Sequence, residues 1–118
     1  MVLFAGCSSD KPEITTIETE KLNLNPETNM LTYTLVVNYA VDVDLESGTT
    51  GLMRVSFPGY DYNQEKEWAL MPGQRNAKTS FKLSWSDYNI GEDINLVVEF
   101  IQGTETLETK NYIVNYRG

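Results

Sequence analysis

The segment at residues 57–63, FPGYDYN, gathers the side chains best suited to hold a ligand. Tyr60 and Tyr62 lie beside Asp61 and Asn63, and Trp68 follows shortly after them. Aromatic rings cover the apolar faces of sugars while carboxylate and amide groups bond the hydroxyls, and aromatic residues are also enriched at protein interfaces. The segment therefore predicts a protein contact or a sugar site. A purely structural role is the alternative, with one tyrosine folded over the core and the tryptophan buried.

A second group of side chains could bind a hard cation. Asp42, Asp44 and Glu46 alternate in the segment VDVDLESG, and calcium favours several carboxylate oxygens. The spacing lacks the third aspartate, the central glycine and the distal glutamate of an EF-hand loop. The group is a weak candidate for a metal site, and the other interpretation is a solvated strand end.

The residues that most enzymes rely on are scarce. The chain contains no histidine and a single cysteine, which removes Ser-His and Cys-His pairs and the usual zinc ligands. The acids Glu92, Asp93, Glu65 and Glu67 could supply an acid and a base, but neighbours on a strand point to opposite faces. We therefore expect no enzymatic activity and no cofactor.

The elements that must position these side chains are strands, because apolar residues recur with a period of two. In the longest run, MLTYTLVVNYAVDV, every second residue from Leu31 to Val43 is apolar or aromatic. Turn residues such as Pro72-Gly73 separate the runs. The predicted strands are Glu13 to Leu24, Met30 to Val43, Leu52 to Phe57, Lys66 to Met71, Ala77 to Trp85, Asp93 to Ile101, and a last strand carrying Leu107, Tyr112, Val114 and Tyr116.

Two of these strands break the alternation. Ile14 and Ile17 have opposite parity, as do Leu107 and Tyr112, which predicts a bulge in the first strand and an irregularity in the last. Seven short strands in about 105 residues predict an all-β fold, a seven-stranded antiparallel β-sandwich at residues 13–118. An eight-stranded barrel is the alternative.

In strand number and order the body resembles immunoglobulin-like and fibronectin type III-like domains. The Cys-Trp-Cys signature of immunoglobulin domains is absent, and Tyr33 or Tyr39 would fill the space of the tryptophan typical of fibronectin type III. Tyr88 precedes the sixth strand and is a candidate for a tyrosine-corner analogue, although its spacing differs from that of the family.

The start of the chain, MVLFAGCSSD, is apolar up to Cys7 and polar after it. Phe4-Ala5-Gly6-Cys7 resembles the lipobox of bacterial lipoproteins, with small residues before the cysteine and Phe4 in place of the usual aliphatic residue. The polar tether that follows is similar to surface lipoproteins of Bacteroidetes. The resemblance implies a signal-peptide remnant at 1–6, lipidation at Cys7 and a tether at 7–12. The alternative is a chance apolar start with Cys7 as a buried or free thiol.

The charge balance narrows the class of partner. The formal net charge of −8 argues against nucleic acid, which requires a basic track. The sequence thus predicts a non-catalytic, lipid-anchored binding or structural module of the cell envelope, at the outer membrane and either periplasmic or surface-exposed. Its expected role is protein–protein interaction with an envelope protein, and the alternative is a carbohydrate-binding module that uses the loop aromatics.

Overall fold

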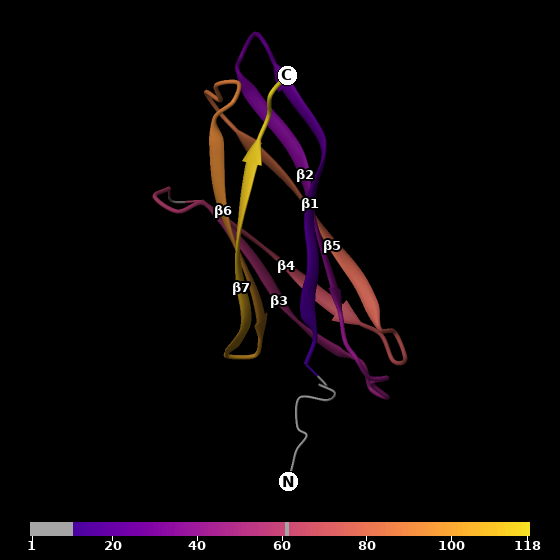
Figure 1. Ribbon diagram of the computed structural model, residues 1–118. Coiled ribbons are helices and arrows are strands. Elements are labelled where there is room, and N and C mark those ends of the chain that lie inside the picture. Colours follow the sequence, from indigo (N-terminus) through magenta and orange to yellow (C-terminus); the bar gives the residue numbers. More distant parts are fainter. Residues whose placement is uncertain (1–10, 61) are drawn as a thin grey trace.

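The computed structural model describes residues 11–60 and 62–118, and it confirms an all-β fold (Figure 1). Each strand is bounded by a turn or loop, and no helix occurs in this part of the chain. The strands are β1 (Glu13–Asn25), β2 (Met30–Ala40), β3 (Thr49–Ser56), β4 (Asn63–Leu70), β5 (Asn76–Trp85), β6 (Asp93–Gln102) and β7 (Glu105–Asn115).

The strands form two antiparallel sheets, with orders β1-β2-β5 and β4-β3-β6-β7. In constant-type immunoglobulin domains the fourth strand joins the first sheet, whereas here β4 pairs with β3. The architecture is therefore an immunoglobulin-like sandwich with the fourth strand on the larger sheet. The barrel alternative is wrong, because the seven strands pair as two separate sheets.

The irregularities predicted in the first and last strands are β-bulges. The pairing of β1 with β2 shifts between Ile14 and Thr16, so that Ile14 and Ile17 oppose Tyr39 and Val37, two residues of the buried face. In β7 the shift falls opposite Phe100 and Ile101 and leaves Leu107 as the extra residue. One inserted residue reverses the parity of every later side chain, so both bulges keep the apolar residues on the core face.

The core lies between the sheets and includes a cluster of three aromatic rings. Trp68 of β4, Tyr39 of β2 and Phe100 of β6 are buried and in mutual contact, with ring centroids 4.4–5.6 Å apart. The alternating residues of β2 are buried from Leu31 to Tyr39, as predicted.

The prediction that the second strand extends to Val43 is wrong, because β2 ends at Ala40, opposite Asn76 where β5 begins. Val41 remains buried, and its N–H donates to the carbonyl of Arg75.

The two ends of the sandwich differ in what they carry, and we name them by their position relative to β1. The chain enters β1 at the entry end, which also carries the β2–β3, β4–β5 and β6–β7 connections (Figure 1). The opposite strand ends form the far end, which carries the β1–β2 turn, the β5–β6 loop and the C-terminus, and the β3–β4 loop projects sideways from these strand ends (Figure 1). The longest principal axis measures 59 Å, against 24 and 23 Å across. The far end is therefore well separated from the point where the chain enters the domain.

The last two residues of the predicted tether contact the sandwich. The Nζ atom of Lys11 pairs with the Glu105 carboxylate at 2.8 Å, and Pro12 is buried. These two residues therefore already contact the sandwich, and the first strand begins at Glu13. Cys7, the signal-peptide remnant at 1–6 and the rest of the tether lie outside the described residues.

Candidate functional site at the far end of the sandwich

The β3–β4 loop holds the aromatic residues that the sequence singled out. Phe57 directly follows β3 with its side chain buried, and its N–H donates to the Tyr62 carbonyl at 3.3 Å, which closes the loop. Tyr60 N–H donates to the Phe57 carbonyl at 3.1 Å, and Gly59 supplies the positive φ of 83° that this tight turn requires. The loop thus projects Tyr60 away from the core.

Four aromatic rings pack in sequence at this end. Tyr62 stacks on Phe57 with centroids 4.5 Å apart and an interplanar angle of 14°. Trp85, the last residue of β5, meets Phe57 edge-on at 5.0 Å and Tyr60 edge-on at 4.8 Å. Edge-to-face packing of this kind is a favourable aromatic geometry. Phe57 is buried, Tyr62 and Trp85 are half-buried, and Tyr60 is 62% exposed, so the group opens progressively toward solvent.

A small pocket of about 170 Å³ opens beside these rings. Polar side chains from the start of β6 complete its wall, and both carboxylates are already held in place. Glu92 accepts a hydrogen bond from the Asn89 N–H at 3.1 Å, and Asp93 accepts one from the Asn115 amide at 2.5 Å. The pocket is lined by Phe57, Pro58, Tyr60, Trp85, Glu92, Asp93, Ile94 and Asn95.

Tyr88 fixes the loop between β5 and β6. Its buried hydroxyl donates to the Glu92 carbonyl at 2.8 Å, with the Tyr116 carbonyl as an alternative acceptor at 3.1 Å, and accepts from the Tyr116 N–H at 2.7 Å. Its own N–H donates to the Asn29 carbonyl in the β1–β2 turn. Tyr88 therefore acts as the predicted tyrosine-corner analogue and ties three chain segments together beneath the site.

Trp68 does not belong to this site, which corrects the sequence prediction. It is fully buried on the inner face of β4, and its indole N–H donates to the Ile101 carbonyl at 3.0 Å. Gly51 of β3 lies against the ring so closely that a Cβ would collide with it and with the Ile101 carbonyl. Closeness in sequence was misleading because β4 carries Trp68 away from the loop into the centre of the sandwich.

Of the other predicted site residues, only some lie at this site. Tyr60 and Tyr62 lie at the site, and Asn63 is exposed as the first residue of β4. Asp61 lies outside the described residues. Trp85 was not predicted as a site residue, because it shares the inward parity of its strand and lies at the strand's last position. Its place at a strand end, beside a loop rich in aromatics, was the available signal.

The proposed metal group is not assembled. Asp42, Asp44 and Glu46 lie in the β2–β3 connection, and the described residues contain no group of three ligands able to hold a metal ion. Asp44 instead pairs with the Arg75 guanidinium, Nε to Oδ1 at 2.7 Å. This hydrogen bond and charge lower the pKa of the Asp44 carboxyl below its ordinary value. The three carboxylates thus lie in a solvated loop, and one of them, that of Asp44, is bonded to Arg75.

Side chains bond single backbone groups on three of the four edge strands, β1, β4 and β5. The Ile14 N–H on β1 donates to the Glu108 carboxylate at 2.6 Å, and the Ala69 N–H on β4 donates to the Tyr39 hydroxyl at 3.2 Å. On β5, the Ser80 carbonyl accepts from Lys66 Nζ at 2.6 Å. Bulges and polar side chains at edges disfavour addition of a foreign strand. Contact with a partner is therefore better served by the end of the sandwich than by its edges.

Comparison of the chain with protein-family models, with curated proteins and with solved structures finds no match. Across residues 11–60 and 62–118, no helix has the length and apolar character needed to cross a membrane. The assignment of a role therefore depends on the geometry of the far end.

Proposed function

We propose that the protein is a non-catalytic, lipid-anchored module of a bacterial cell envelope that binds a protein partner through the far end of its sandwich. The anchor is Cys7, supported by the lipobox-like segment Phe4-Ala5-Gly6-Cys7. A single acyl chain holds a protein only marginally, so stable anchoring takes more than one. The lipids would hold the entry end near the membrane and direct the far end outward.

One observation carries the choice of surface. Five large hydrophobic side chains are exposed among the described residues, and three of them lie at the far end: Tyr60 and Ile90 at 62% and Met30 at 37%. Tyr60 packs on Trp85, and Trp85 pairs across the strands with Leu31, the residue next to Met30. The β5–β6 loop that carries Ile90 is hydrogen-bonded to the β1–β2 turn. Exposed apolar groups gathered at one end are typical of interaction sites.

Site-specific photo-crosslinking in the native bacterium tests this surface. A photoreactive amino acid at position 60 or 90 is expected to yield one discrete crosslinked protein band. Position 71 is the matched control, because Met71 is equally exposed but lies in the β4–β5 turn at the entry end. Equal crosslinking from position 71, or none from positions 60 and 90, would contradict the proposed surface.

The anchor has its own test. Expressed from the full-length gene, the Cys7→Ser variant is expected to leave the membrane fraction and to lose incorporation of a radiolabelled fatty acid. A Ser8→Ala variant is the control and should remain membrane-bound and labelled. Membrane retention of Cys7→Ser would reject the lipid anchor without bearing on the partner surface.

The pocket beside Tyr60 favours a second candidate function, the binding of a neutral sugar. The ring of Tyr60 is open to solvent, and the carboxylates of Glu92 and Asp93 and the amide of Asn95 line the same hollow. A glycan array probed with the unmodified chain and with Tyr60→Ala tests this. Binding of a neutral glycan that the substitution abolishes would favour the sugar site over the protein contact.

A further inference from the structure

A separate surface of the molecule concentrates positive charge. The outer face of the β1-β2-β5 sheet, with the adjoining edge of β4, carries four of the nine cationic residues of the chain. We call it the lysine face. Its cations are Lys21, Lys66, Lys78 and Lys82. The chain has a net charge of −8, so a cluster of four positive charges differs in sign from the charge of the molecule as a whole.

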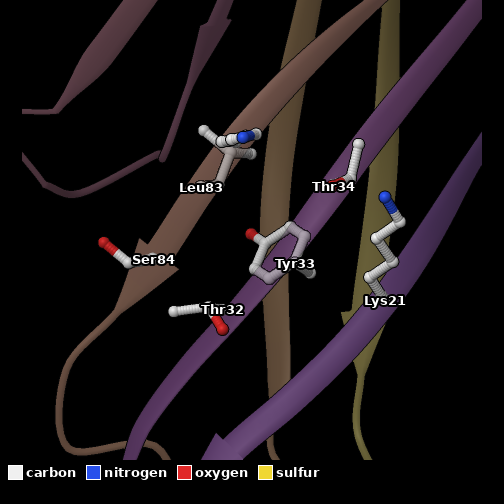
Figure 2. Close-up of a pocket in the computed structure, with 7 residues that line it drawn as sticks. Lys21, Thr32, Tyr33, Thr34, Leu83 and Ser84 are labelled. Carbon is white, nitrogen blue, oxygen red and sulfur yellow. The ribbon is translucent and has the colours of Figure 1, made fainter.

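The lysine face is hollowed along its length. Two hollows of about 370 and 470 Å³ share Lys21, Thr34 and Lys82, so they form one groove. A third of about 540 Å³, lined by Asn38 and Lys78, lies further along the same strands toward the entry end. In Figure 2, Lys21 on β1 and Thr34 on β2 lie along one side of the first hollow, and Ser84 on β5 lies along the other.

None of the four cations of the lysine face forms an ion pair within the described residues. Glu20 is the single carboxylate among the residues that line the three hollows. Unpaired ammonium groups around a shared groove leave a positive potential for an anionic ligand. Four of the five other cations are paired, and Arg117 forms no ion pair with a described residue. The pairs are Lys11 with Glu105, Arg54 with Glu65 and Glu99, Arg75 with Asp44, and Lys110 with Glu108.

Part of the groove is held in a fixed arrangement. Lys66 Nζ donates to the Ser80 carbonyl at 2.6 Å and lies 5.8 Å from the centre of the Phe81 ring. A side chain that is already ordered loses less conformational freedom when a ligand binds. The ammonium group of Lys66 is therefore already held in place. Lys78 and Lys82 lie on β5, the strand to which Lys66 is bonded.

The strand register spaces the charges and places hydroxyl and amide groups between them. Lys82 pairs across the ladder with Thr34, and Lys78 pairs with Asn38. The two lysines are four residues apart on β5, a separation of about 13 Å along an extended strand. A single small anion cannot bridge that distance, whereas an extended polymer with repeated negative charges can.

We propose that the lysine face binds a linear anionic polysaccharide, with carboxylate or sulfate groups on the lysines. Thr32, Thr34 and Ser84 would bond its hydroxyls. Between Thr32 and Asn38 of β2 no large apolar side chain is exposed, so the face offers an acidic peptide little besides charge. The backbone of β2 is fully engaged with β1 and β5, which excludes strand addition there. This site is independent of the far-end surface.

Isothermal titration of the full 118-residue chain with polygalacturonate tests the proposal. The Lys78→Gln/Lys82→Gln double variant is expected to bind at least tenfold more weakly, with a shallower dependence on salt concentration. The Lys110→Gln/Arg117→Gln variant is the matched control, because it removes two positive charges away from the groove and should bind normally. Tyr60→Ala should also bind normally.

Several outcomes would overturn the proposal. The first is a failure of the chain to bind either polygalacturonate or dextran sulfate. The second is equally weakened binding in the control variant, which would indicate non-specific charge attraction. Binding of poly-glutamate or of phosphatidylglycerol vesicles that matches the polysaccharide and is lost in the same double variant would assign the face to an acidic peptide or a membrane surface instead. Circular dichroism melting confirms that both double variants fold.

Discussion

Two groups of aromatic residues lie in this molecule, and they behave differently. In the centre, Tyr39, Trp68 and Phe100 are covered by both sheets and have almost no exposed surface. At the far end, Phe57, Tyr62, Trp85 and Tyr60 pack with equally short centroid distances, yet the group opens to solvent at Tyr60. The ring separations are therefore similar in both groups, whereas the exposure of the outermost ring distinguishes them.

The difference follows from what covers each group. Tyr39 comes from one sheet and Trp68 and Phe100 come from the other, so the two sheets cover these rings, whereas Phe57, Tyr60 and Tyr62 follow the end of β3, where loops provide the cover. The central rings therefore stabilise the fold, and the outermost ring at the end is available for contact. Substitutions in the two groups should separate these roles.

The largest effect should come from the centre. Trp68→Ala is expected to lower the free energy of unfolding by about 3–5 kcal/mol, because it leaves a cavity and removes an indole hydrogen bond. Trp85→Ala, the same change at the half-buried end, should cost about 1–2 kcal/mol. Urea denaturation followed by fluorescence measures both. Equal losses would remove the distinction between the two groups.

The next effect concerns the hydroxyl that supports the far end. Tyr88→Phe keeps the ring but leaves the Tyr116 N–H without its acceptor, and we expect a loss of about 1–3 kcal/mol. Hydrogen exchange should show faster exchange of the Tyr116 amide while the amides of β2 stay protected. If that amide remains protected, the Tyr88 hydroxyl does not hold the C-terminal segment in place at this end of the sandwich.

A smaller effect should appear at Tyr33, whose buried hydroxyl has no hydrogen-bond partner among the described residues. Burial, and secondarily the charge of Tyr62, raise the pKa of Tyr33 above its ordinary value. The unfolded chain releases this proton near pH 10 while the folded chain retains it, so stability should fall as the pH rises above about 10.

Tyr33→Phe tests this directly. At pH 7 it should be neutral or stabilising by up to about 1 kcal/mol, since it removes an unsatisfied polar group. Above pH 10 it should weaken the alkaline loss of stability, which thermal melts at stepped pH would record. Tyr39→Phe is the control, because the Tyr39 hydroxyl is hydrogen-bonded to Thr79 and Ala69 and its removal should lower the free energy of unfolding at pH 7. An unchanged alkaline profile in Tyr33→Phe would contradict the prediction.

The smallest effect on stability should come from Tyr60. Its exposed ring contacts the edge of Trp85, so Tyr60→Ala is expected to change the free energy of unfolding by no more than about 0.5 kcal/mol. The same variant should lose the partner crosslink expected from this end, with Ile90 carrying the photoreactive group. A large destabilisation would place Tyr60 with the structural aromatics instead.

Much of the fold was predictable because alternation reports directly on which strand face is buried. The alternating residues of β2, β5 and β6 lie in the core as expected, and the parity breaks at Ile14/Ile17 and Leu107/Tyr112 correspond to bulges. The end of β2 was not predictable, since Val41 keeps the apolar pattern after the ladder with β5 has stopped. Apolar periodicity records burial, and pairing ends where the partner strand ends.

The candidate site was only partly predictable, because sequence proximity does not give spatial proximity. Trp68 follows the tyrosine loop closely but lies in the centre, and Trp85 lies distant in sequence but against Tyr60. The grouping of Met30, Tyr60 and Ile90 joins three connections of the chain, and no local pattern links them. The lysine face likewise depends on which strands are neighbours.

By itself, the sequence determined the class of fold, the irregular strands and the lack of the residues that common enzymes use, because these depend on residue type and local period. It also carries the lipobox-like segment on which the proposed anchor rests. Only the tertiary structure decided which aromatic residues are covered and which cations gather on one face. Burial and charge clustering arise from segments far apart in the chain, and strand pairing alone brings those segments together.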